Sequence, residues 1–246
     1  MKKILFTLLI AFVAIACSKD ATTNSDTTMN RDSVGGSMAT FSLVGDYLYI
    51  VDSGRLNVFS VLNPKNPSKV NSVYVGFNIE TLFALDQYLF IGSQEGMYIY
   101  SIAKPEAPEQ LSQYFHFTAC DPVVANTTHA FVTLHSSSLC GNALNVLQVY
   151  DITNLREPVK IHERNLSQPK GLALNGNFLV VCDDDLKFFD ISDPANPILK
   201  YSENKSFKDL IFYDNRLFAF GEREVTQYGW KATDFSDLYV ISTVKY

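Results

Sequence analysis

Residues 176–197 read GNFLVVCDDDLKFFDISDPANP. Two short runs in this stretch, FLVVC and LKFFD, are rich in β-branched and aromatic residues, which favour strands. The Gly-Asn pair before the first run and the aspartates between the two runs are typical of turns. Pro194 and Pro197 then stop the second run, because proline fixes φ at about −65° and has no N–H to donate to a sheet. The stretch therefore predicts a β-hairpin that ends in a proline turn before a further strand.

The same hairpin pattern occurs five times along the chain. Its copies begin at Gly45, Asp86, Thr127, Gly176 and Asp214, at intervals of 41, 41, 49 and 38 residues. One strand precedes each hairpin and another follows it, so the repeating unit is four strands in roughly 40 residues, which is typical of a propeller blade. A β-solenoid would have shorter repeats, and a β-sandwich would not repeat so regularly. The fold class predicted is all-β, a β-propeller of five blades with four antiparallel strands each.

The copies resemble the LVIVD repeat family, which is named for a strand like LxVxD followed by a D/N-P-x-x-P turn. The best matches are LKFFDISDPANP at 186–197, LQVYDITNLREP at 147–158 and LNVFSVLNPKNP at 56–67. The fifth copy lacks the proline pair and has Asp234-Phe235-Ser236-Asp237 instead. The resemblance implies a β-propeller on a bacterial extracytoplasmic protein. It implies little about chemistry, because propellers support many functions.

The N-terminus has the pattern of an export signal. Residues 1–16 carry two lysines and then an apolar run, broken only by Thr7, that is too short to span a membrane. The run ends in Ala14-Ile15-Ala16-Cys17, which resembles a lipobox with alanine in place of the usual leucine; the alternative is ordinary cleavage after A-x-A. We expect a lipoprotein signal peptide at 1–16, a flexible tether at 17–36 that is lipidated on Cys17, and the propeller at 37–246.

The composition favours some partners and disfavours others. The formal net charge is −6 and no Lys/Arg cluster follows an aromatic platform, so nucleic acid is not expected to bind. The four histidines lack metal-ligand spacing, so no metal and no cofactor is expected; Asp183–Asp185 fit either a tight hairpin or Ca²⁺ ligands. Ser18-Lys19-Asp20 resembles an export signal of surface lipoproteins. We expect a monomeric, membrane-anchored lipoprotein of the Gram-negative outer membrane, exposed at the surface.

The loops between the second and third strands of the blades should share one face. The loop at 135–145 is the longest and carries Cys140, while Cys120 begins the same blade. Export exposes the chain to an oxidising compartment, so we predict a Cys120–Cys140 disulfide worth about 3 kcal/mol in the chain-entropy model. Cys182 is then either a small buried residue or a competing partner for one of these cysteines.

The first strand of each blade should begin at the mouth of the central channel. This places five charged residues there as candidate ligand-face residues: Glu80, Asp121, Lys170, Lys208 and Asp209. They would either orient a polar ligand or be solvated rim charges. The first functional hypothesis is a binding platform for a protein or glycan, with no catalytic motif evident. The alternative is a glycan-active propeller enzyme that uses the channel-mouth carboxylates.

Overall fold

The computed structural model describes residues 35–115, 122–136, 144–232 and 234–246. These residues form twenty strands and no helix. This described part of the chain accordingly has no helix that is long and apolar enough to cross a membrane. The predicted signal peptide and most of the predicted tether lie outside the described residues.

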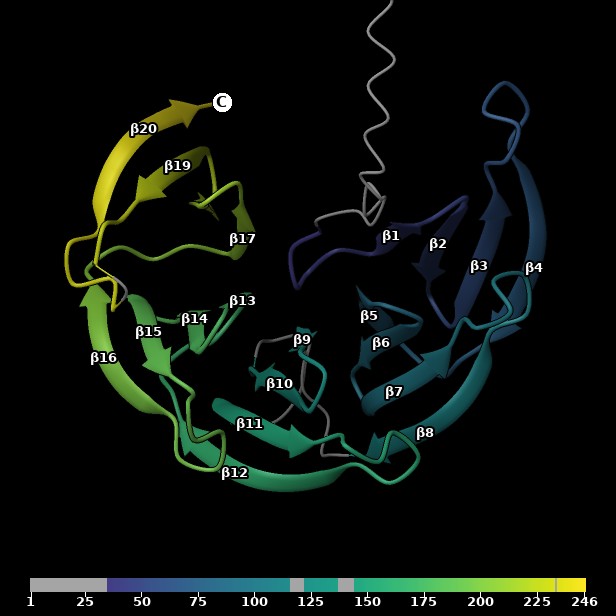
Figure 1. Ribbon diagram of the computed structural model, residues 1–246, viewed down its shortest axis with the longest axis horizontal. Coiled ribbons are helices and arrows are strands. Elements are labelled where there is room, and N and C mark those ends of the chain that lie inside the picture. Colours follow the sequence, from purple (N-terminus) through teal and green to yellow (C-terminus); the bar gives the residue numbers. More distant parts are fainter. Residues whose placement is uncertain (1–34, 116–121, 137–143, 233) are drawn as a thin grey trace, which may run out of the picture. The chain divides into compact units, whose positions relative to one another are not determined.

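The strands form five sheets of four antiparallel strands, and each sheet is one blade of a β-propeller. Figure 1 shows the first strand of each blade nearest the centre and the fourth at the periphery. Blade 1 consists of β1 (Phe41–Val44), β2 (Tyr47–Asp52), β3 (Arg55–Ser60) and β4 (Ser68–Tyr74). Blade 2 consists of β5 (Ile79–Leu85), β6 (Tyr88–Ser93), β7 (Gly96–Ser101) and β8 (Glu109–Phe115). Blade 3 consists of β9 (Val123–Ala125), β10 (His129–Leu134), β11 (Val146–Asp151) and β12 (Val159–Asn165). Blade 4 consists of β13 (Leu172–Asn175), β14 (Phe178–Cys182), β15 (Leu186–Asp190) and β16 (Ile198–Glu203). Blade 5 consists of β17 (Asp209–Tyr213), β18 (Arg216–Phe220), β19 (Glu224–Gly229) and β20 (Tyr239–Lys245). The predicted fold class is confirmed.

The proline motif makes the turn between the third and fourth strands. In blade 4 the Asp190 carboxylate accepts a hydrogen bond from the Ser192 N–H at 2.9 Å, and Asp193 accepts one from the Ala195 N–H at 3.2 Å. Such Asx turns satisfy backbone donors that leave the sheet. Pro197 then directly precedes β16. The turn thus separates the inner part of the blade from its outer strand.

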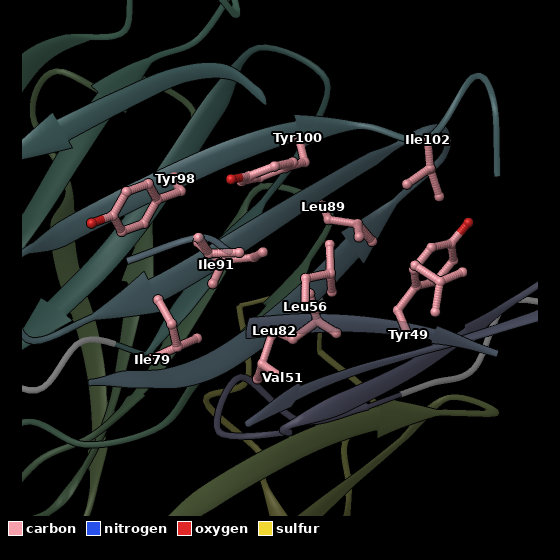
Figure 2. Close-up of a cluster of buried hydrophobic side chains, with 12 residues drawn as sticks. Tyr49, Val51, Leu56, Ile79, Leu82, Leu89, Ile91, Tyr98, Tyr100 and Ile102 are labelled. Carbon is pink, nitrogen blue, oxygen red and sulfur yellow. The ribbon is translucent and has the colours of Figure 1, made fainter. Parts of the chain in front are cut away.

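Apolar cores join successive blades. Tyr49, Leu56 and Val58 of blade 1 pack with Leu82 and Leu89 of blade 2, as Figure 2 shows for most of this cluster. Three similar clusters join blades 2 and 3, blades 3 and 4, and blades 4 and 5. Each fully buried apolar side chain contributes roughly 1.5–3 kcal/mol to the stability of the fold. These four cores therefore hold each blade against the next one along the chain, from blade 1 to blade 5.

Blades 1 and 5 each leave one face incompletely covered. Five residues are buried in each of β6 and β10 and four in β14, whereas only two are buried in β2 and in β18. Among the described residues no apolar core joins blade 5 to blade 1. The two end blades must therefore be connected in another way.

Candidate functional site

A short N-terminal segment, Gly35–Met38, connects the inner strands of blades 4 and 5 to the start of blade 1; we call it the clasp. The Ser37 hydroxyl donates to Asp209 Oδ1 at 3.0 Å, and the Met38 N–H donates to Asp209 Oδ2 at 3.3 Å. The Ser37 Oγ also accepts a hydrogen bond from the Leu172 N–H at 2.8 Å. Asp209 begins β17 and Leu172 begins β13, so one buried serine reaches two blades.

Two glycines make room for the Asp209 carboxylate. A Cβ atom at Gly36 would lie 2.0 Å from Asp209 Oδ2, and one at Gly171 would lie 2.3 Å from Asp209 Oδ1. The Gly171 N–H also donates to the Lys208 carbonyl at 2.9 Å, which joins the inner strands of blades 4 and 5. Any larger residue at either glycine would displace the carboxylate and open the clasp.

Burial raises the pKa of Asp209, while hydrogen bonds from Leu210, Ser37 and Met38 lower it to a smaller extent. The folded state therefore binds the Asp209 proton more tightly than the unfolded state does. The stability that this carboxyl contributes is fully present below its ordinary pKa, and it falls as the pH rises towards the higher folded pKa.

Replacement of Asp209 is expected to loosen the clasp. We predict that Asp209→Ala lowers the free energy of unfolding at pH 7 by about 1–2 kcal/mol, because it leaves the hydroxyl of the buried Ser37 and the Met38 N–H without their acceptor. Urea unfolding measures this change.

Asp209→Asn should also flatten the pH dependence of stability just above the ordinary carboxyl pKa. A pH profile identical to that of the wild-type protein would contradict the assigned role of burial.

Besides Asp209, which begins β17, three of the predicted ligand-face residues lie where the first strands begin. Glu80 is half-buried in β5 and accepts a hydrogen bond from Gln94 Nε2 at 2.9 Å. Lys170 is half-buried just before β13, and Lys208 is exposed just before β17, with its ammonium 3.3 Å from Glu222 Oε1. The face on which these residues lie also carries the connections between second and third strands, and we call it the loop face. Its described part offers charges of both signs to a partner.

The remaining predicted site residues fall outside the described part of the chain. Asp121, Cys120, Cys140 and the lipidation site Cys17 belong to residues for which the structure gives no account, and the Cys120–Cys140 disulfide stays a prediction. Cys182 is a free thiol that is fully buried in the core between blades 4 and 5. Burial raises the pKa of this thiol, and Asp209 raises it further, so Cys182 is a protonated, small core residue at neutral pH.

Asp183, Asp184 and Asp185 form the connection between β14 and β15 and surround the ammonium of Lys187. Lys187 Nζ lies 2.9 Å from Asp183 Oδ2 and also contacts Asp184 and Asp185. The Asp183 carboxylate is fully buried and accepts the N–H groups of Ser167 and Gln168. The hydrogen bond with Lys187 holds the pKa of Asp184 well below its usual range. This connection is therefore a tight hairpin in which the Lys187 ammonium offsets one of three negative charges, and one oxygen of each carboxylate lies within 4.8 Å of the others.

Two hollows lie on the face opposite the loop face, each between two neighbouring blades and at equivalent positions in the repeat. The first, of about 270 Å³, lies between blades 1 and 2, and the second, of about 250 Å³, lies between blades 2 and 3. Asp86 lines both, and Ile102 and Ile152 occupy equivalent positions. The sequence predicted only turns on this face and no binding site. The repeat spacing could have indicated these hollows, because it places equivalent residues at each blade junction.

Comparison with known families agrees with this architecture. The LVIVD repeat matches residues 35–75 and 168–204, which correspond to the clasp with blade 1 and to blade 4 with the segment before it. The chain carries LVIVD repeats. The predicted resemblance is confirmed for the repeat type in these two segments, and each of the five blades has four antiparallel strands. No curated protein matches the chain.

Solved structures that resemble this LVIVD-repeat propeller share its fold at low sequence identity. A functionally unknown protein from Desulfotomaculum acetoxidans has a TM-score of 0.70 at 12% identity, over 84% of this chain and 69% of its own. A protein from Lactobacillus plantarum has a TM-score of 0.65 at 12% identity, over 80% of this chain and 67% of its own. Apo AztD from Citrobacter koseri has a TM-score of 0.58 at 11% identity, over 80% of this chain and 58% of its own. At these identities the similarity shows the fold alone.

Proposed function

We propose that this protein is an outer-membrane lipoprotein whose LVIVD-repeat propeller is a platform that binds a protein or glycan partner at the loop face. The lipobox-like sequence that ends in Cys17 supports the anchor. Rigid scaffolds typically carry binding residues on the loops that they hold in place. The end of β10 at Leu134 and the start of β11 at Val146 lie on the loop face, and the connection between them is the longest of its kind in the sequence.

The observation that carries this proposal is a difference between two adjacent charged residues where β17 begins: Asp209 is held by hydrogen bonds within the protein, whereas Lys208 is exposed. Both oxygens of Asp209 are engaged by the clasp, so this carboxylate is part of the scaffold. Lys208, the adjacent residue, is exposed, and its Glu222 partner is 82% exposed. An exposed ion pair of this kind contributes little to stability. Lys208 is therefore available to an anionic group of a partner, with Lys170 and Glu80 to fix its orientation.

The alternative, a glycan-active enzyme, needs two carboxyl groups that converge on one ligand. Asp209 has the raised pKa that suits a general acid, but Ser37 and Met38 cover it. Glu80 with Asp121 would be the remaining pair. Release of reducing sugars from envelope glycans by the wild-type protein, with loss of that activity in Glu80→Gln, would favour this alternative over the platform.

Site-specific photocrosslinking in cells tests the platform. A photoreactive amino acid at Lys208 should give a discrete adduct with a protein or glycan of the envelope, because this side chain is at the proposed interface. The matched control is the same amino acid at Lys200, which is 42% exposed on the outer strand β16 and should give no such adduct. Equal adducts at both positions, or none at either, would contradict the proposal.

A further inference from the structure

The outer strands of blades 1 to 4 carry two features that protect exposed sheet edges. Each is directly preceded by a proline and contains at least one charged residue before its last position. The prolines are Pro67, Pro108, Pro158 and Pro197, and the charged residues are Lys69, Glu109, Lys160, Glu163, Arg164 and Lys200. Prolines and charges at an edge prevent pairing with another strand. All five outer strands also contain a bulge, so the bulge does not distinguish one blade from another.

The outer strand of blade 5 lacks both features. β20 reads YVISTVK, follows Leu238 rather than a proline, and has its one charge at the last position, Lys245. All seven residues are exposed. Val240 is 55% and Val244 is 63% exposed. An exposed edge strand with apolar β-branched residues is a template for pairing with another strand.

The apolar surface continues from this edge onto the uncovered face of blade 5. Tyr239 and Ile241 of β20 lie against Gly229 of β19, and both are nearly half exposed. A partner strand whose side chains point to this side of the sheet would contact Tyr239 and Ile241, which increases the buried area beyond that of the backbone pairing alone.

We propose that β20 pairs antiparallel with β20 of a second copy of this chain, with Ser242 at the two-fold axis. The strand is self-complementary in this register. Val240 faces Val244 of the other copy, Ile241 faces Thr243, and Tyr239 faces Lys245. No like charges oppose each other, and such cross-strand pairs stabilise a sheet. A two-fold interface uses the same patch on both copies, so a sequence that matches itself in reverse favours a second copy over an unrelated strand.

The dimer is expected to be weak, because one strand pair with its flanking side chains buries less area than a standard interface. We expect the full chain in detergent to sediment as a concentration-dependent dimer in analytical ultracentrifugation. Val244→Lys should raise the dissociation constant at least about tenfold, since it places a charge opposite Val240 of the second copy. The matched control is Val159→Lys, because Val159 is 55% exposed on the outer strand β12. Both variants keep the same N-terminus, so association through the anchor would affect them equally.

A cysteine at the proposed axis distinguishes this register from other contacts. Under mild oxidation Ser242→Cys should give a covalent dimer, because residue 242 faces itself only when the strands pair about this position. Val159→Cys should give none. A monomeric wild-type protein, an equal effect of Val244→Lys and Val159→Lys, or equal crosslinking of the two cysteine variants would each overturn the proposal.

Discussion

Phe235→Ala is expected to lower the free energy of unfolding by about 3–5 kcal/mol, among the largest single-residue effects in this protein. Phe235 is 2% exposed, and its ring centroid lies 4.9 Å from that of Trp230 and 5.1 Å from those of Phe178 and Phe188. Removal of such a ring loses its burial and leaves a cavity between blades 4 and 5. Urea unfolding followed by the fluorescence of Trp230, the single tryptophan, measures the change.

The matched control for this substitution is Phe77→Ala. Phe77 is 61% exposed, so its removal should change stability by no more than about 0.5 kcal/mol. Equal destabilisation by the two substitutions would contradict the assignment of Phe235 to the core. The position also explains how blade 5 does without the proline pair, since Phe235 anchors the connection between β19 and β20 by packing.

Lys187→Ala is expected to lower the free energy of unfolding by about 3 kcal/mol, because it removes the counterion of a buried carboxylate. The Lys187 side chain is 16% exposed and the Asp183 side chain is fully buried, and the loss of one partner from a buried ion pair is strongly destabilising. Burial lowers the pKa of Lys187, but its hydrogen bonds with Asp184, Asp185 and Asp183 outweigh this and raise it. The lysine thus stays charged through the neutral range.

The pH dependence of the Lys187→Ala effect follows from the lowered pKa of Asp184. Stability from a carboxyl with a lowered folded pKa is present above its unfolded pKa and is lost as the pH falls through the folded pKa. The difference between Lys187→Ala and the wild-type protein should therefore shrink in acid. Lys160→Ala is the control, because its ion pair with Glu163 lies at the surface and should contribute at most about 1 kcal/mol. A Lys187→Ala effect as small as that of Lys160→Ala would contradict the buried ion pair.

The blades could be predicted from the sequence because their determinants are local. Turn residues such as Gly176 and Asp214 and the strands around them lie within a few residues of each other. The pattern of a single hairpin is weak evidence for a fold, but its five copies together indicate a propeller of five blades. The Lys187 cluster was also within reach of the sequence, since Lys187 lies two positions after Asp185.

The clasp was not predictable in the same way. Ser37 and Asp209 are 172 residues apart, and Ser37 lies at the edge of a segment whose composition indicates a tether. The glycines at 36 and 171 matter only because they approach Asp209, and single-residue patterns carry no information on such long-range contacts. The incompletely covered faces of blades 1 and 5 could not be predicted for the same reason. The sequence shows that the blades repeat, but it does not show which contacts the last blade makes with the first.

In the described part of the chain the clasp, rather than a fifth apolar core, joins blade 1 to blades 4 and 5. A double-mutant cycle of Ser37→Ala and Asp209→Ala, measured by urea unfolding of the full chain, tests it most directly. The account predicts that the effects of the two substitutions are not additive, with a coupling free energy of about 1 kcal/mol or more. Additive effects, with a coupling below about 0.3 kcal/mol, would show that Ser37 and Asp209 do not interact and would contradict the clasp.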